Sequence, residues 1–320
     1  FAVMAGIPPS ARLVALEVAV SAIDVRQYRN IKLLAPDVAV ITNIGPAHLR
    51  GNEDTAAIAA RKANLFRGVR RGGLAIVCRD TAHYDEIAAR ALAEGLVLIS
   101  YGEHEQADCR LLAFDADQGR AVVAYLGQVL EYPLGMAGRH FAVNSLVCLI
   151  LARHLGLPLA AVAEGCAALK PVEGRGESLP LAIDGKRVMV VDDSYNANPL
   201  SMSAALQQLS ALSHRGRALL LLGDMLELGR QAQQYHLELV PDIARCSPGK
   251  VYLVGSYMKA VAGRLREQGI SCRWFEQVGP VMASLRQELQ DGDLVLVKSS
   301  NGTRLSEVVA ALKSLSAPSR

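Results

Sequence analysis

Short apolar runs alternate along this chain with segments whose apolar residues recur every three or four positions. In the first half, apolar runs at residues 38–42 and 74–77 precede helical patterns at 56–66 and 84–93. Runs this short have the length of buried strands, and the longer periodic segments have the length of helices. This alternation predicts βα units and a largely parallel sheet.

Further elements are expected in the first half. Residues 12–17 predict a strand near the start of the chain. Residues 110–116 and 120–126 flank a short polar turn and predict a hairpin, so the sheet is expected to be mixed. Two long helical patterns follow, at 141–155 and 159–169.

A segment rich in proline and glycine, 171–176, follows these helices. Because 320 residues exceed the size of one ordinary domain, we predict two domains, 1–176 and 177–320. The strands expected in the second domain are each followed by a plausible helix, which predicts a doubly wound, Rossmann-like fold. These strands cover residues 187–191, 218–222, 251–254 and 294–297.

The composition excludes several classes of function. The net charge is only +3 and the Lys and Arg residues are scattered, so no nucleic-acid partner is expected. No apolar run reaches the ~18 residues of a membrane span and no signal peptide opens the chain, so membrane insertion is not expected. The six cysteines are widely spaced, without a C-x-x-C pair, and indicate reduced thiols in the cytoplasm.

Polar residues gather directly after four of the expected strands, in residues 43–49, 192–198, 223–229 and 298–304. In open parallel sheets, ligands bind at the carboxyl ends of the strands, because loops and helix amino termini converge there. The sequence therefore predicts a ligand site assembled from these loops.

Glu17, His48 and Lys62 are the candidates for chemistry in the first domain. Each has a simpler structural interpretation, with His48 as a hydrogen-bonding loop residue and the two charges as solvated side chains. If Glu17 and His48 converge, their oxygen and nitrogen suit Mg²⁺. A protonated lysine is a poor metal ligand, so the residues alone leave the role of Lys62 open.

Two further candidates lie close to the expected domain boundary. Asn144 follows a glycine-containing turn on a helix, where its amide can match the edge of an adenine or can be an ordinary surface side chain. Arg175 lies between two glycines and suits either a phosphate or an interdomain salt bridge.

The run D-D-S-Y-N-A-N-P at 192–199 is denser in polar groups than a turn requires and favours a functional interpretation. One of its aspartates can bind ribose hydroxyls or a water on magnesium. Asp224 and Glu227 suit either a ligand or helix capping. The loop that carries Lys298 and Arg304 offers a cation, hydroxyls and backbone amides for a carboxylate or phosphate.

Taken in chain order, three motifs resemble those of the Mur ligases. They are N-I-x-P-A-H-L at 43–49, D-D-S-Y-N-A-N-P-x-S-M at 192–202 and G-D-M-x-E-L-G at 223–229, with His236 after the last. The resemblance covers nearly the whole chain. It implies a partial central ATPase domain with a mostly parallel sheet, followed by a Rossmann-like carboxyl-terminal domain.

The resemblance implies an ATP-dependent ligase of peptidoglycan synthesis. ATP phosphorylates a carboxyl substrate, and an amine then attacks the acyl phosphate to form an amide. The motifs are most similar to those of the member that joins D-alanyl-D-alanine to a UDP-linked N-acetylmuramoyl tripeptide, so these are the expected substrates. Closure of the second domain over the first would exclude water from the acyl phosphate.

The resemblance also implies roles for individual residues. Lys62 matches a lysine that CO₂ converts to an anionic carbamate, which would hold Mg²⁺ together with Glu17 and His48. The resemblance further implies contacts from Asn144 to adenine, from Arg175 to a phosphate and from Asp192 to the ribose or nucleotide. Six more residues are implied to contact the nucleotide or the amine substrate: Tyr195, Asn196, Asn198, Asp224, Lys298 and Arg304.

The family's phosphate-binding loop, G-x-x-G-K-[S/T], and its UDP-sugar domain are not in this sequence. Because the sequence begins with Phe and a strand is expected at 12–17, we expect a missing amino-terminal segment or subunit, without which the chain would be inactive. Two alternatives stay open: a paralogue acting on another carboxylate, and a non-catalytic subunit with the ligase fold. A nucleotide-dependent dehydrogenase is disfavoured, because no G-x-G-x-x-G follows an expected strand.

Overall fold

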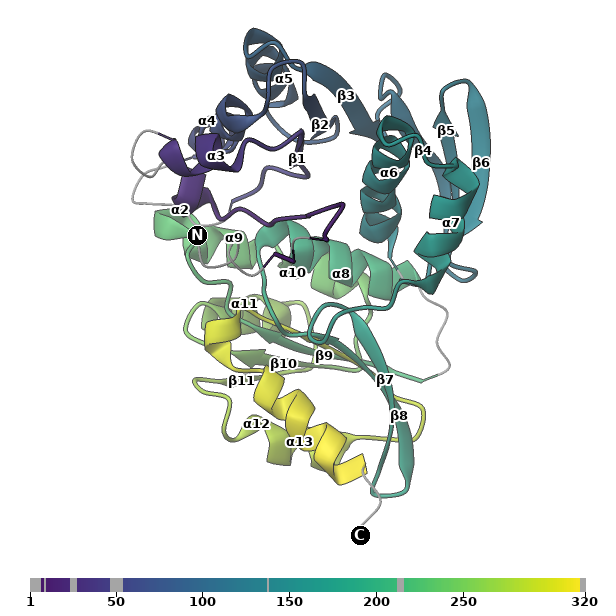
Figure 1. Cartoon of the computed structure of the whole chain (residues 1–320). Coiled ribbons are helices and arrows are strands. Elements are labelled where there is room, and N and C mark those ends of the chain that lie inside the picture. Colours follow the sequence, from purple (N-terminus) through teal and green to yellow (C-terminus); the bar gives the residue numbers. More distant parts are fainter. Residues whose placement is uncertain are drawn as a thin grey trace.

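Two six-stranded sheets, one in each half of the chain, organise the described part of the molecule. Figure 1 shows the first half with its helices at the top and the second half at the bottom. The computed structural model describes residues 7–8, 10–23, 28–46, 54–136, 138–211 and 216–316.

Neighbouring strands of the first sheet follow one another in the chain. The strands are β1 (Val38–Ile41), β2 (Leu74–Cys78), β3 (Val97–Gly102), β4 (Cys109–Asp115), β5 (Arg120–Tyr125) and β6 (Gln128–Pro133). β1 to β4 pair in parallel, whereas β4, β5 and β6 pair antiparallel. The βα units, the hairpin and the mixed sheet are therefore confirmed.

Helices cover both faces of this sheet. They are α2 (Val20–Ile23), α3 (Arg29–Leu34), α4 (Thr55–Ala63), α5 (Tyr84–Ala93), α6 (Arg139–His154) and α7 (Leu159–Ala168). On one face, α4 and α5 pack Ile58 and Ile87 against Val77 of β2. On the other face, α6 and α7 pack Leu146 and Cys166 in a core with Ile76. Alternate residues of β2 thus serve two cores, which explains its continuous apolar run.

The expected strand at 12–17 is wrong. These residues have no regular secondary structure, and the described sheet begins at β1 instead. Leu13 and Val14 are 66% and 48% exposed. An apolar run becomes a strand only where another strand supplies ladder hydrogen bonds and a core buries its side chains. This segment has neither among the described residues.

The second sheet is parallel except at one edge. Its strands are β7 (Glu177–Ile183), β8 (Lys186–Asp193), β9 (Ala218–Gly223), β10 (Lys250–Val254), β11 (Cys272–Phe275) and β12 (Leu294–Lys298). Their order is β11-β10-β9-β12-β8-β7, and only β7 pairs antiparallel. This order sets the carboxyl ends of β8, β12 and β9 side by side, as expected for a doubly wound fold.

Helices lie on both faces of the second sheet as well. They are α8 (Pro199–Ala211), α9 (Ala232–Leu237), α10 (Val240–Arg245), α11 (Met258–Glu267), α12 (Val281–Glu288) and α13 (Ser306–Ser316). α8 to α11 share one core, and α12 and α13 share the other. Because all first-sheet strands precede residue 176 and all second-sheet strands follow it, we propose 1–176 and 177–320 as the two domains.

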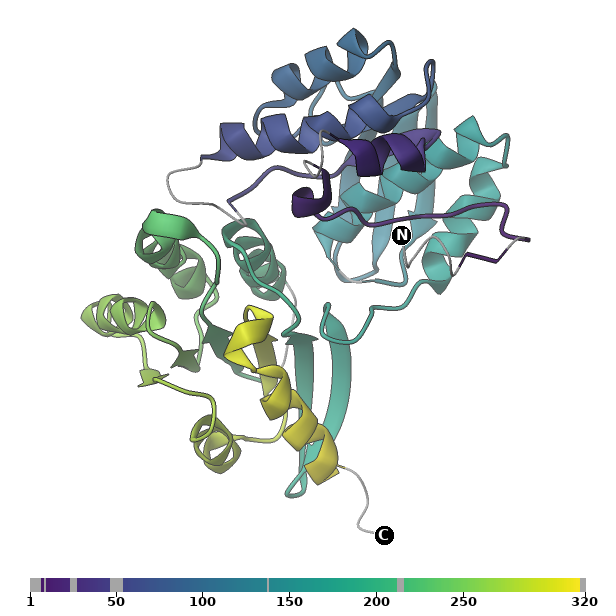
Figure 2. The same cartoon turned by 60° about the vertical axis from the view of Figure 1, so that its left-hand side comes forward.

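Helix α8 lies between the two sheets (Figures 1 and 2). A Cβ atom added to Gly45, after β1, would lie 2.4 Å from the side chain of Leu200 on α8. A Cβ atom added to Gly138, before α6, would lie 2.6 Å from the side chain of Gln208 on α8. Since these glycines precede α4 and α6, the strand-end loops of the first domain meet the helix that follows β8.

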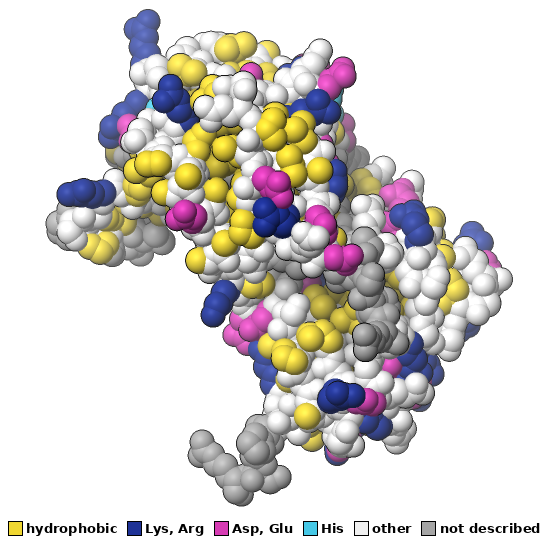
Figure 3. All heavy atoms as spheres, turned by 90° about the vertical axis from the view of Figure 1, so that its right-hand side faces the viewer, with side chains coloured by type: hydrophobic (Ala, Val, Ile, Leu, Met, Phe, Trp, Pro, Cys, Tyr) yellow, Lys and Arg dark blue, Asp and Glu magenta, His cyan; other side chains and the backbone are white. Residues whose placement is uncertain are grey.

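Figure 3 shows apolar side chains spread over the surface on the β6 side of the first domain. Leu126 and Val129, at the turn between β5 and β6, are 57% and 67% exposed.

Each helix in the described part of the chain is too short or too polar to cross a membrane.

Candidate functional site

Lys62 lies near the carboxyl end of β1. Its Nζ donates a hydrogen bond to the carbonyl of Asn43 at 2.9 Å. The Thr81 hydroxyl donates to the side chain of Asn43 at 3.0 Å and accepts from the amide of Ile44 at 2.7 Å. Burial lowers the pKa of Lys62, so a larger fraction of its amine is neutral than on an exposed lysine. Thr81, which ties this loop together, was not among the expected site residues.

The residues expected to hold Mg²⁺ do not form a cluster in the described structure. Glu17 is exposed, in the segment that forms no strand. His48 lies outside the described residues. Within those residues, no three His, Cys, Asp or Glu side chains converge in a way that could hold a metal ion. The set of Glu17, His48 and Lys62 therefore stays a prediction.

A buried ion pair lies at the carboxyl ends of β8 and β12. The parallel register places Lys298 beside Asp193. The Lys298 ammonium, which is 2% exposed, donates to the Asp193 carboxylate at 2.6 Å and to the carbonyl of Asn196 at 3.1 Å. Burial lowers the pKa of Lys298 and raises that of Asp193, so each charge depends on the other.

Asp192 faces the interior of the second domain. It is 2% exposed, and its carboxylate accepts hydrogen bonds from the amide and the hydroxyl of Ser194 at 3.1 and 2.6 Å. Side chains alternate along β8, so Asp192 lies on the same face of the sheet as Val190, whereas Asp193 lies on the face of Val191, towards the core of α8 to α11. The nucleotide role of Asp192 stays a prediction, and Asp193 is the acid that meets Lys298. Counting alternate positions from Val190 separates the two aspartates, but only the register with β12 places Asp193 beside Lys298.

The two asparagines of the same run shape the loop. The Asn198 side chain accepts the amide of Ser201 at 2.9 Å, which caps the first turn of α8. The Asn196 side chain accepts the adjacent amide of Ala197 at 2.8 Å. Both side chains thus have partners in the loop, and their contacts to nucleotide or substrate stay predictions.

Arg175 and Tyr195 connect the domain linker to the loop after β8. The guanidinium carbon of Arg175 lies 4.3 Å from the centre of the Tyr195 ring, a cation–π contact. The Tyr195 amide donates to the carbonyl of Gly174 at 3.0 Å, and the Gly176 amide donates to the carbonyl of Asp192 at 2.8 Å. Both side chains are exposed, so a ligand can reach them.

Asn144 and His140 lie four positions apart on α6, where the first domain approaches the second. Asn144 is exposed, as its predicted adenine contact requires. The surrounding protein and the Lys298 ammonium lower the pKa of His140, which favours its neutral form at physiological pH. His140 was not singled out from the sequence, although it lies one helical turn before Asn144 on the same face of α6.

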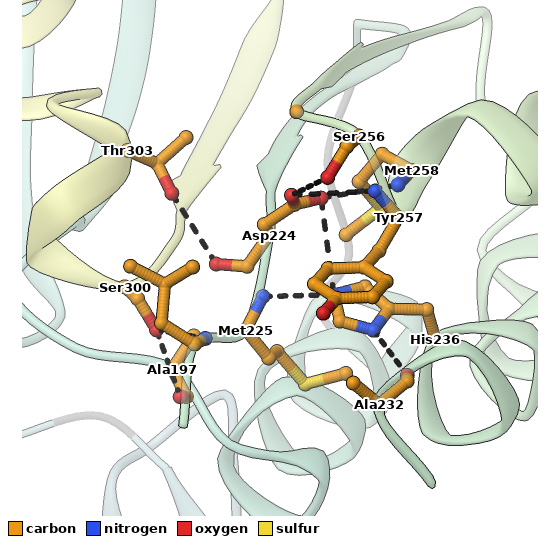
Figure 4. A network of polar contacts seen from close by, with 12 residues as sticks. Ala197, Asp224, Met225, Ala232, His236, Ser256, Tyr257, Met258, Ser300 and Thr303 are labelled. Carbon is orange, nitrogen blue, oxygen red and sulfur yellow. Dashed lines mark hydrogen bonds and ion pairs between the residues drawn. The ribbon is translucent and has the colours of Figure 1, made fainter. Parts of the chain in front are cut away.

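Asp224 and Arg304 differ in how much a ligand can reach them. The Asp224 carboxylate accepts from the amide of Met258 at 3.0 Å and from the amide of Tyr257 at 3.3 Å, at the start of α11 (Figure 4). This is the helix-capping role that the sequence left open. Arg304 is exposed and pairs with Glu307. Substrate contacts by Asp224 and Arg304 stay predictions.

The carboxyl-terminal edges of two α/β sheets meet across α8, and buried charges and exposed polar groups line that junction. This arrangement defines a two-domain α/β protein whose strand-end loops, where ligands bind in sheets of this kind, lie at the junction of the two domains. The chain belongs to the Mur ligase family. Residues 2–152 match the model of the Mur ligase middle domain, and residues 174–301 match the model described as "Mur ligase, glutamate ligase domain". The resemblance seen in the motifs is confirmed.

The chain is similar to curated UDP-N-acetylmuramoyl-tripeptide–D-alanyl-D-alanine ligases. It is 29% identical to that of Rickettsia prowazekii, over 87% of this chain and 62% of the relative. It is 28% identical to that of Bacillus subtilis, over 88% of this chain and 60% of the relative. A crystal structure of MurF from Acinetobacter baumannii matches with a TM-score of 0.76 and 25% identity, covering 89% of this chain and 61% of that one. The chain thus spans about three fifths of the length of these relatives.

Proposed function

We propose that this chain forms the ATP-binding middle domain and the carboxyl-terminal domain of an ATP-dependent peptide ligase of peptidoglycan synthesis. The proposed reaction joins D-alanyl-D-alanine to a UDP-N-acetylmuramoyl tripeptide. The observation that carries the proposal is that both domains match the family while the curated relatives bear this activity in their names.

The proposed reaction has two steps. The carboxylate of the tripeptide attacks the γ-phosphorus of ATP, forming an acyl phosphate and releasing ADP. The amine of the dipeptide then adds to the acyl carbon, and the tetrahedral intermediate loses phosphate to give the amide. A proton leaves the amine in this second step. The proposed contacts to the nucleotide are Asn144, Arg175 and Asp192, with Tyr195, Asn196 and Asn198 beside them.

The buried cation Lys298 supports a role in binding an anionic substrate group. Its ammonium is 2% exposed and already paired with Asp193, so it is held in one position. Preorganised charges of this kind cost little to align when a ligand binds. We assign Lys298, Arg304 and Asp224 to the side of the site that receives the amine substrate.

Lys62 fits the proposed carbamate. CO₂ reacts with a neutral amine, and burial lowers the pKa of Lys62, which increases the neutral fraction. The carbamate would hold Mg²⁺ with Glu17 and His48, and the ion would neutralise phosphate charge during transfer. In this structure the Lys62 amine instead meets the carbonyl of Asn43.

We also infer a cytoplasmic location, without nucleic-acid partners. All six cysteines are free thiols, which is typical of proteins in a reducing compartment.

The full-length gene product tests the proposed function. We expect phosphate release from ATP only when UDP-N-acetylmuramoyl tripeptide and D-alanyl-D-alanine are both present. Release with a different carboxylate in place of the tripeptide would instead identify the paralogue. If no carboxylate supports release, the non-catalytic alternative holds.

The carbamate is tested by Lys62→Ala in the same assay. Activity should fall by at least about 100-fold, because the variant loses a charge that stabilises the transition state, and a short carboxylic acid should restore part of it. Lys32→Ala, an exposed lysine of the same domain, is the matched control and should keep full activity. Full turnover by Lys62→Ala would rule out the carbamate.

A further inference from the structure

His236 is buried in the second domain. It lies on α9, is 0% exposed, and stacks on Tyr257 with ring centres 5.0 Å apart and planes 23° apart. Figure 4 shows its ring between the loop after β9 and the chain that enters α11. A fully buried histidine is costly unless both ring nitrogens have partners.

The hydrogen bonds of His236 determine which nitrogen carries the proton. Nε2 lies 2.8 Å from the amide nitrogen of Met225, which can only donate, so Nε2 accepts. Nδ1 lies 2.6 Å from the carbonyl oxygen of Ala232, which can only accept, so Nδ1 donates. The ring is therefore neutral and protonated at Nδ1. Burial lowers the pKa of His236 and supports the neutral form.

The Met225 amide belongs to a loop that is tied to the loop after β12. The carbonyl of Asp224 accepts from the amide of Ser300 at 3.1 Å and from the hydroxyl of Thr303 at 3.3 Å. The Leu226 amide donates to the Ser300 hydroxyl at 2.9 Å. Met225 lies between these two attachments, and its own amide is held by His236.

A third loop joins the same network. The Ser300 hydroxyl, which accepts from Leu226, donates to the carbonyl of Ala197 in the loop after β8 at 3.3 Å. A Cβ atom on Gly302 would lie 2.6 Å from the side chain of Leu226, so the two loops also pack closely. Hydrogen bonds therefore join the loops after β8, β9 and β12, and the loops after β9 and β12 carry the residues proposed to bind the amine substrate.

We infer that His236 is a positioning residue. It holds the Met225 amide and thereby fixes the loop 223–229, and through Ser300 the loop 298–304, in the arrangement that binds the amine substrate. The substrate part of this inference rests on the proposed ligase function. His236 itself touches no ligand, since it is fully buried.

Two readouts on this chain need no enzyme activity. In ¹⁵N-histidine NMR spectra, His236 should carry its proton on Nδ1 and leave Nε2 bare near neutral pH. Hydrogen exchange of the Met225 amide should be at least about tenfold faster in His236→Leu than in the wild type, because this amide loses its acceptor. The Leu226 amide, which donates to Ser300, should also exchange faster, because the loop that carries it is no longer held at Met225. His236→Gln offers an acceptor at a similar position and should restore slow exchange.

The full-length gene product gives the third readout. His236→Leu should raise KM for D-alanyl-D-alanine by about five- to tenfold, the equivalent of one lost hydrogen bond, and leave KM for ATP within about twofold. His236→Gln should restore the KM for the dipeptide. His154→Leu, at an exposed position on α6, is the matched control and should match the wild type.

The outcomes separate the two proposals. A wild type without ligase activity contradicts the proposed function, while the NMR and exchange results still decide whether His236 holds the loop. A proton on Nε2, unchanged amide exchange in a folded His236→Leu, or equal rises in both KM values would overturn the inference.

Discussion

Lys298 and Asp193 are 105 positions apart, yet the register of two parallel strands places them side by side. The pairing register of β8 and β12 brings the two side chains together at the carboxyl ends of these strands, and no sequence motif is involved. Because burial shifts the pKa of both groups toward the neutral form, removing one partner leaves the other charge poorly compensated.

Lys298→Met should lower the free energy of unfolding by about 2 kcal/mol. This is less than the loss for a fully buried pair, because Asp193 is 25% exposed. The double variant Lys298→Met with Asp193→Asn should recover about half of the loss. Urea denaturation measures all of these values.

Lys313→Met is the matched control for that prediction. Lys313 pairs with Glu173 and Glu177 at the surface and is 32% exposed, so its removal should cost less than about 1 kcal/mol. Equal losses at Lys298 and Lys313 would contradict the importance of the buried pair.

Cys148 should be the most reactive thiol near neutral pH. It is exposed on α6, and its interaction with the nearby Cys166 thiol lowers the pKa of Cys148 to about 7. The thiolate is the reactive form, so the alkylation rate should rise with pH to a plateau, with a midpoint near that value. Iodoacetamide labelling followed by mass spectrometry measures the rate. Burial raises the pKa of Cys78 and Cys246 to about 11, so both should react slowly.

Cys166→Ala tests the cause of this reactivity. Without the Cys166 thiol, the alkylation midpoint of Cys148 should move up toward the ordinary value of 9.0. Cys272→Ala removes a thiol elsewhere and should leave the midpoint unchanged. A midpoint that stays near 7 in Cys166→Ala would show that another group stabilises the thiolate.

The junction between β10 and α11 shows how an element boundary depends on distant residues. Gly255 has φ +112, and an added Cβ atom would lie 2.3 Å from the carboxyl carbon of Asp224. The close approach lets the Asp224 carboxylate reach the amides of Tyr257 and Met258 and cap α11. A glycine is needed here both for its backbone conformation and for its lack of a side chain.

Gly255→Ala should lower the free energy of unfolding by about 3 kcal/mol. The added methyl group would strain the backbone at residue 255 and displace the Asp224 carboxylate that caps α11. Gly269→Ala is the matched control, because Gly269 also has a positive φ, +74, but nothing lies within 4 Å of its added Cβ atom. It should cost about 1 kcal/mol. Thermal or urea unfolding compares the two, and equal losses would show that the contact with Asp224 is unimportant.

The sequence predicted most described elements where the apolar pattern and the burial agree. The pattern at 84–93 coincides with α5, and the hairpin pattern near 110–126 became β4 and β5. The predicted strand at 12–17 is wrong because the segment has the local pattern of a strand but no described strand pairs with it. The apolar pattern indicates which side chains are suited to burial. A strand also needs a neighbouring strand to pair with, which the local sequence does not identify.

At the scale of the whole molecule, the two domains have separate cores. The buried clusters of the first domain end at Cys166, and those of the second begin at Ile183. Helix α8 belongs to the second domain by its core and touches the first by Leu200 and Gln208. Separate cores are compatible with the domain closure that the proposed ligase reaction would need to exclude water.

Residues 177–320, expressed alone, should therefore fold. We expect a single cooperative unfolding transition by circular dichroism, because every strand of the second sheet and both of its cores lie in this fragment. A fragment that starts at residue 195 lacks β7 and β8, uncovers β12, and should not unfold cooperatively. The proposed boundary at 176 is wrong if 177–320 shows no transition.

The sequence alone predicted eight of the described strands, the mixed and the doubly wound sheet, and the motifs of the Mur ligase family, but not β3, β6, β7 or β11. These features are local, because periodicity and motifs are read within a few neighbouring residues. The packed structure was needed to see that Asp193 rather than Asp192 contacts Lys298, that His236 accepts from the Met225 amide, and that Asp224 caps α11. Those contacts join segments far apart in the chain, and their geometry depends on strand register and helix packing, which no local pattern encodes.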